Sequence, residues 1–120
     1  MDQTIERRER ILNELKSNYP GKYAFDMNGD ANHFVCEIEP TVDHPEYDRA
    51  VEVMIKTKAH KHSKMTQRYL VLRGDLELHV NDQVINLTAG DIYTIEPGIV
   101  HWAKSLNEAW VELYSTPGWT

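Results

Sequence analysis

HKHSKMTQRYLVLRG at residues 60–74 and GDIYTIEPGIVH at residues 90–101 decide both the fold and the chemistry expected of this chain. In an extended strand, residues two apart point to the same face, so His60 and His62 can present both imidazoles to one point. His101 lies beside a hairpin-rich segment and can close the site from another strand. Because imidazole is the commonest metal ligand among side chains, the pattern predicts a metal site built across a β-barrel.

The two stretches resemble the paired motifs of the cupins, a superfamily of small β-barrels. The first cupin motif places a glutamate after a His-x-His pair and a glycine six residues later; here Gln67 stands at the glutamate position and Gly74 at the glycine. The second motif is matched by Gly90, Gly98 and His101. Residues 51–115 carry the resemblance, which implies an all-β cupin or jelly-roll barrel. It also implies a metal held by His60, His62, Gln67 and His101.

Gln67 makes the resemblance more specific, because it is shared with one group of cupins. Small single-domain cupins that linearise unsaturated uronates, in pectin and alginate breakdown, also have a glutamine at this position. Those proteins use a carboxylate on the last strand, ahead of a Thr-Pro pair. In this chain Glu112 precedes Thr116-Pro117, one residue farther away than the resemblance predicts. The resemblance implies Glu112 as a catalytic acid/base; an exposed strand carboxylate is the alternative.

Strand alternation adds candidates for the wall of the site. If Gln67 points into the barrel, Tyr69 does too, and its hydroxyl can either orient a substrate or satisfy a hydrogen bond in the core. Lys56 and Lys58 share the parity of His60 and can bind a carboxylate or phosphate at the mouth. Solvated surface lysines are the alternative reading.

A shell of three imidazoles and one amide is neutral, so a bound divalent metal keeps its full charge and acts as a strong Lewis acid. These ligands suit nickel, zinc, iron or manganese without choosing among them. We expect a redox-neutral metalloenzyme, an isomerase or lyase acting on a small sugar or sugar acid. A non-haem iron dioxygenase and a non-enzymatic small-ligand-binding cupin are the alternatives.

The rest of the chain predicts one compact domain. Apolar residues at helical spacing predict a helix from about Asp2 to Asn18, capped by Asp2 or Thr4 and packed on the barrel as an N-terminal element of residues 1–20. Its apolar stripe consists of Ile5, Ile11, Leu12, Leu15 and Tyr19. Short strands separated by turn residues predict the barrel over residues 21–120, with hairpins at Asn81-Asp82 and Asn107-Glu108.

Composition limits the partners. The chain has 120 residues, a net charge of −6 and a sequence pI near 5.4, which argues against a nucleic-acid-binding surface. It has no apolar run of membrane length and no signal peptide, and one cysteine, Cys36, fits a reducing cytoplasm. By alternation Cys36 shares a face with Phe34 and Ile38, so we expect a buried thiol. A small carbohydrate-like substrate is the expected partner, and the cupin resemblance implies a homodimer.

Overall fold

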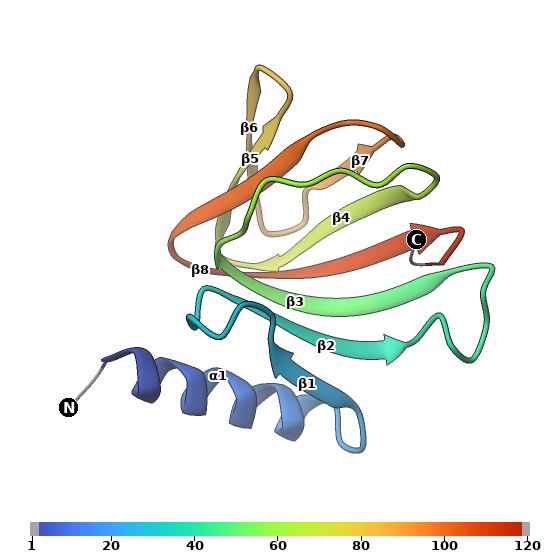
Figure 1. Cartoon of the computed structure of the whole chain (residues 1–120). Coiled ribbons are helices and arrows are strands. Elements are labelled where there is room, and N and C mark those ends of the chain that lie inside the picture. The colour runs from blue at the N-terminus through green and yellow to red at the C-terminus, as the bar shows by residue number, and fades with distance from the viewer. Residues whose placement is uncertain (1–2, 119–120) are drawn as a thin grey trace.

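A computed structural model describes residues 3–118 as one helix and eight strands that wrap into a barrel (Figure 1). The elements in chain order are α1 (Gln3–Asn18), β1 (Tyr23–Asp26), β2 (His33–Glu39), β3 (Asp48–Lys56), β4 (Thr66–Arg73), β5 (Asp75–Val80), β6 (Gln83–Thr88), β7 (Ile92–Ile95) and β8 (His101–Thr116). The predicted all-β barrel with an N-terminal helix is confirmed. Within residues 3–118, no helix is long and apolar enough to cross a membrane.

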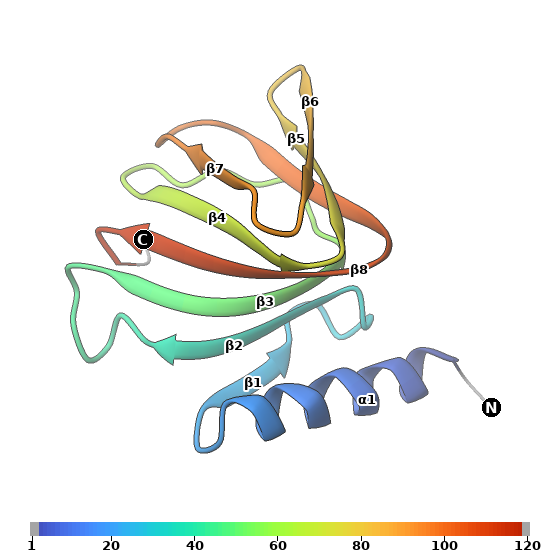
Figure 2. The same cartoon turned by 180° about the vertical axis from the view of Figure 1, so that it is seen from behind.

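The strands form one antiparallel sheet in the order β1-β2-β3-β8-β4-β7, with the β5-β6 hairpin attached through β8 (Figure 2). β8 is the central strand, because its first part pairs with β5 and its second part lies between β3 and β4. The predicted hairpin at Asn107-Glu108 is wrong. The chain continues through these residues as one bent strand, and the ladder with β3 jumps from Met54–Ala109 to Lys56–Lys104. An irregularity of this kind bends a strand without reversing it.

The sheet buries its inner face and the part of its outer face that lies beneath α1. The inner face encloses the barrel core, which consists of Met54, Tyr69, Val71, Leu76, Leu78, Val80, Leu87, Ile95, Ala103, Ala109, Val111 and Leu113. The outer face of β2, β3 and β8 packs against α1. Strand alternation decides the side: on β3, Val51 and Val53 join the core beneath α1, whereas Met54 joins the barrel core. A polar residue on the inner parity of β2 or β3 is therefore enclosed by the barrel.

The helix docks through the middle of its apolar stripe. Ile11 and Leu15 are fully buried, and each such side chain contributes about 1.5–3 kcal/mol. Ile5, predicted to belong to the same stripe, is 45% exposed. The buried thiol of Cys36 is confirmed. Asp2, one of the two predicted caps, lies outside the described residues.

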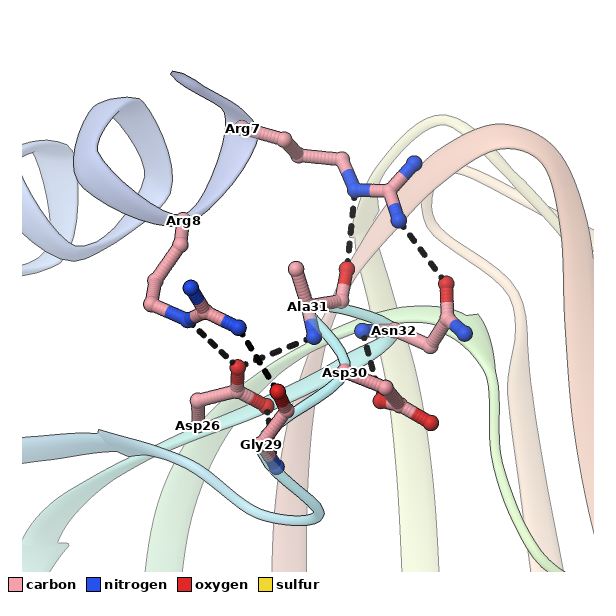
Figure 3. A network of polar contacts seen from close by, with 7 residues as sticks. All are labelled: Arg7, Arg8, Asp26, Gly29, Asp30, Ala31 and Asn32. Atoms are coloured by element: carbon pink, nitrogen blue, oxygen red, sulfur yellow. Dashed lines mark hydrogen bonds and ion pairs between the residues drawn. The ribbon is translucent and has the colours of Figure 1, made fainter. Parts of the chain in front are cut away.

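Two arginines tie α1 to the turn between β1 and β2 (Figure 3). The Arg7 guanidinium donates to the Ala31 carbonyl at 2.8 Å, and the Arg8 guanidinium donates to Asp26 at 2.9 Å and to the Gly29 carbonyl at 2.7 Å. Asp26 also accepts the backbone N–H of Ala31 at 2.9 Å. Because charge-assisted bonds to backbone groups are among the stronger ones, the helix holds this turn in a defined position.

Gly74, at the turn between β4 and β5, is required by both conformation and space. Its φ is +87°, and a Cβ on it would lie 2.4 Å from the Glu108 carbonyl oxygen. Gly74→Ala is expected to lower the free energy of unfolding, measured in urea, by about 2–4 kcal/mol, since left-handed strain adds to a backbone clash. Gly90→Ala is the matched control: its φ is +94° with nothing within 4 Å of the added Cβ, so about 1 kcal/mol is expected. Equal losses would contradict the clash.

Candidate metal centre

The first and third histidines of the motif are joined through their backbones. His60 and His101 form an isolated antiparallel bridge, in which each N–H donates to the other's carbonyl at 3.0 and 2.9 Å. The Gly98 N–H donates to the His62 carbonyl at 2.7 Å and fixes the second histidine to the same loop. The predicted strand at His60 and His62 is wrong, since apart from this bridge residues 57–65 are irregular. The long-range bridge, together with the tie to Gly98, positions the rings.

The three imidazoles converge. Their ring centroids are 4.3 Å apart for His60 and His101, 4.9 Å for His60 and His62, and 5.6 Å for His62 and His101. One ligand nitrogen from each ring lies within 4.8 Å of the others. His62 and His101 are buried, whereas His60 is more open to solvent. Three nitrogens at this separation can hold one metal ion between them.

Backbone carbonyls select the tautomer of two rings. His60 Nδ1 lies 2.8 Å from the Lys58 carbonyl oxygen, and His101 Nδ1 lies 2.9 Å from the Ile99 carbonyl oxygen. A carbonyl only accepts, so each Nδ1 carries the proton and donates it. In a neutral imidazole, Nε2 then carries the free lone pair. This is the outer hydrogen bond that metal-binding histidines ordinarily make.

Burial keeps two of the rings neutral. Desolvation, with smaller contributions from the neighbouring His60 and His101 rings, lowers the pKa of His62 to about 4. Desolvation also lowers the pKa of His101, although the bond to the Ile99 carbonyl opposes it. Because metals bind unprotonated imidazole, these two rings are ready to bind a cation near neutral pH without first losing a proton.

Gln67 and Tyr69 lie on the inner face of β4, as alternation predicts. Gln67 is 1% exposed, and its Oε1 has no hydrogen-bond partner among residues 3–118. The Tyr69 ring stands edge-on to His101, with centroids 6.3 Å apart. Desolvation raises the pKa of Tyr69, with a smaller contribution from the charge of Glu52. Tyr69 is therefore a neutral hydroxyl-bearing side chain beside the third histidine.

The donor set fits a divalent metal. His101 Nε2 is buried and has no hydrogen-bond partner among the described residues, as is also true of the Gln67 amide oxygen. Leaving a buried polar atom unpaired costs about 1–3 kcal/mol, so a cation that binds such atoms would compensate for that cost. Imidazole nitrogen and amide oxygen are accepted by several first-row divalent metals.

The structure does not bring Glu112 to the histidines. Glu112 lies on the outer face of β8, away from the barrel core, where it is paired in the sheet with Val51. Its carboxylate lies 3.4 Å from Arg49 Nη1. The inward residues of this part of β8 are Ala109, Val111 and Leu113. An acid/base role for Glu112 stays a prediction, with a surface ion pair as its observed contact.

The inner face of β2 and β3 instead carries acidic side chains that the sequence reading missed. Glu52 is 2% exposed and hydrogen-bonded to His33 Nε2. Burial raises the pKa of Glu37 to about 8, with further contributions from Asp48. The alternation of AVEVMI places Glu52 on the same face as Met54, but only the paired register of β2 and β3 brings His33 to it.

Two adjacent cavities lie outside the histidines. One, of about 200 Å³, is lined by Met27, Asn28, His33, Lys58 and His60. The other, of about 540 Å³, shares Asn28 and Lys58 with the first and is also lined by Lys56 and Trp102. Both predicted lysines are exposed and line the larger cavity, and Lys58 also lines the smaller one together with His60.

Comparison with known proteins gives a family match. Residues 51–116 match the model of the cupin domain. Among curated proteins, the acireductone dioxygenase of Aquifex aeolicus (strain VF5) is 35% identical over 89 residues, which are 68% of this chain and 48% of that protein. The chain therefore spans about half the length of this curated relative.

Solved structures share the fold. KdgF from Halomonas sp. has a TM-score of 0.69 at 17% sequence identity, over 79% of this chain and 86% of that chain. An RmlC-like cupin from Shewanella frigidimarina NCIMB 400 has a TM-score of 0.71 at 18% identity, over 82% of this chain and 86% of that chain. At these identities the likeness concerns the barrel.

Substitution of the third histidine tests the centre. Wild-type protein dialysed against zinc is expected to retain about one equivalent, and His101→Gln less than about a fifth of that, because one imidazole and the Nε2 lone pair are lost. Plasma mass spectrometry measures the content. His44→Gln is the control, since His44 stacks on Tyr47 instead. Zinc content unchanged in His101→Gln would remove the proposed centre.

The low pKa of His62 predicts an acid-sensitive fold in the chelator-treated chain. Between the unfolded value of 6.5 and the folded value of about 4, the unfolded chain binds more protons at this residue. The free energy of unfolding therefore falls as the pH decreases through that window. Wild type should lose up to about 3 kcal/mol more than His62→Gln between pH 7.5 and 4.5 in urea unfolding. Parallel pH profiles of the two proteins would contradict this.

Proposed function

Because this chain belongs to the cupin family, whose domain model matches residues 51–116, we propose that it is a metal-dependent, redox-neutral enzyme of the isomerase or lyase type. Its substrate is a small sugar or sugar acid. The metal is held by His60, His62 and His101 with the amide oxygen of Gln67. The observation that carries the proposal is the convergence of three imidazoles, with one ligand nitrogen of each within 4.8 Å of the others, in a barrel that also buries an amide oxygen with no hydrogen-bond partner in residues 3–118.

The charge of the shell favours this chemistry. Imidazole and amide groups carry no charge when they bind a metal, so the ion would keep its full divalent charge. Such a metal supplies Lewis acidity, which polarises a carbonyl or hydroxyl or lowers the pKa of water. The barrel residues add orientation and water exclusion, with the Tyr69 ring against His101 and the apolar core beneath it. None of these contributions requires a change of oxidation state.

The cavities support an anionic, oxygen-rich substrate. Lys56 and Lys58 line the larger one together with a single carboxylate, Asp30, and their ammonium groups can pair with a carboxylate of the substrate. The Trp102 ring is held by stacking on His79, with centroids 3.8 Å apart, and forms part of the same wall. The volume of this cavity, about 540 Å³, lies in the range of small-molecule sites. The glutamine at position 67 supports the same class through the resemblance to uronate-linearising cupins.

A second candidate is an iron-dependent dioxygenase. The observation that favours it is the 35% identity to an acireductone dioxygenase over 68% of this chain. A three-histidine centre is compatible with non-haem iron. This candidate predicts oxygen consumption by the iron-loaded chain with a small enediol or diketone, and no turnover with zinc.

The test loads the chain separately with zinc, nickel, manganese and iron and supplies unsaturated galacturonate prepared from pectate. We expect turnover without oxygen uptake, followed by loss of the alkene absorbance and by proton NMR of the product. Gln67→Glu should keep its metal but lower kcat by about tenfold or more, because a carboxylate reduces the charge of the centre. Gln83→Glu, an exposed change on β6, is the control.

The outcomes separate the candidates. Turnover with iron alone and stoichiometric oxygen uptake would establish the dioxygenase instead. Binding of galacturonate without turnover, at full occupancy by each metal, would indicate a ligand-binding cupin. A Gln67→Glu variant as fast as wild type would contradict the neutral-shell argument while leaving the enzyme class standing.

A further inference from the structure

His33 and Glu52 form a hydrogen-bonded couple inside the barrel. His33 on β2 lies opposite Met54 of β3, so Glu52 is its diagonal neighbour on the same face. His33 Nε2 is hydrogen-bonded to Glu52 Oε1. The two side chains are 7% and 2% exposed. The pair therefore lies on the concave side of the sheet, away from the core beneath α1.

Each member of the couple lies near a different part of the candidate metal centre. His33 lines the cavity of about 200 Å³ whose wall also includes His60 and Lys58. On the other side, the charge of Glu52 acts on Tyr69, and the Tyr69 ring contacts His101 edge-on. A small molecule in this cavity would touch the His33 imidazole and the first motif histidine together.

Fold stability does not account for the couple. Burial of a carboxylate costs several kcal/mol unless its oxygens are fully paired. Glu52 Oε2 is buried and has no hydrogen-bond partner among residues 3–118. An apolar side chain at this place would extend the barrel core, in which Met54 of the same face already takes part. A buried carboxylate oxygen without a partner needs an explanation other than packing, and the hydrogen-bond partner of this acid, His33, lines a cavity.

We propose that His33 and Glu52 are the proton-transfer dyad of the enzyme, with the His33 imidazole as acid/base and the Glu52 carboxylate as its positioning partner. The inference rests on the proposed function. Glu52 occupies Nε2, so Nδ1 is the nitrogen that exchanges a proton with the substrate. This division of roles follows the logic by which a buried carboxylate orients a catalytic imidazole.

The step is balanced without a co-reactant. His33 Nδ1 accepts a proton from a substrate hydroxyl or from a carbon next to a carbonyl, and the electron pair of the broken bond stays on the substrate. The resulting imidazolium is stabilised by the Glu52 carboxylate. The same proton then returns to a second atom of the substrate, which produces an isomer and restores the neutral imidazole. Lys58 in the same cavity wall can balance the charge of an acidic substrate.

The first test compares matched substitutions in the metal-loaded chain. Glu52→Gln and His33→Gln are expected to lower kcat for the turned-over sugar acid by about a hundredfold or more, with little change in KM and full metal content. Glu77→Gln is the control, because Glu77 pairs with His79 in a similar couple outside the barrel, at 2.6 Å. A kcat within about threefold of wild type in both dyad variants would overturn the proposal.

A second test does not need the natural substrate. Bromoacetate is small and anionic, and an unprotonated imidazole nitrogen that it can reach displaces its bromide. In the zinc-loaded chain we expect carboxymethylation of His33, located by peptide mass spectrometry. Glu52→Gln should slow it by about tenfold, and Glu77→Gln should leave it unchanged. Lack of reaction at His33, or equal rates in Glu52→Gln, would identify a purely structural hydrogen bond, whether or not any sugar acid is turned over.

Discussion

The reciprocal backbone bridge between His60 and His101 is the contact on which the candidate centre depends. It joins an irregular segment to the start of β8 across forty residues of sequence, and its two hydrogen bonds set the separation of the two imidazoles. The bond from Gly98 to the His62 carbonyl adds the second motif histidine to the same frame. Because backbone groups carry this frame, the rings are placed before any ion binds, and less ordering free energy is needed for binding.

The barrel positions the remaining polar groups by simple alternation. On β3, Val51 and Val53 face α1 while Glu52 and Met54 face the barrel. On β4 the same period places Gln67 and Tyr69 inside. Each inward polar side chain replaces an apolar one that would have strengthened the core, so the interior combines packing with a line of functional groups. The helix contributes indirectly, since Arg7 and Arg8 fix the turn whose residues wall the cavities.

Local patterns were sufficient to predict some of this and not the rest. The three histidines His60, His62 and His101 could be predicted from their spacing in the sequence. That spacing identifies the motif even though His62 lies in a loop and not on a strand. The cupin resemblance implied Gln67, and a period of two along the strand then placed Tyr69 on the same face. The hairpin at Asn107-Glu108 failed because turn-forming residues also suit a bulge within a long strand, and only the pairing with β3 distinguishes the two. His33 and Glu52 are nineteen residues apart, and their contact depends on a strand register that no local pattern encodes.

The charge distribution links the centre to the dyad. Neutral ligands leave the charge of a bound dication uncompensated, and a low-dielectric interior makes such a charge costly. A carboxylate among the ligands would compensate it but weaken the Lewis acid. Glu52 offers a second way to place negative charge near the metal centre. It lies inside the barrel and is hydrogen-bonded to His33, its charge acts on Tyr69, and the Tyr69 ring stands edge-on to His101. In the proposed enzyme, a carboxylate inside the barrel but outside the ligand shell would offset the desolvation of the cation without donating electrons to it. The glutamine at position 67 and the glutamate at position 52 can thus be understood as one arrangement, in which the carboxylate expected in the ligand shell is moved to the acid/base partner.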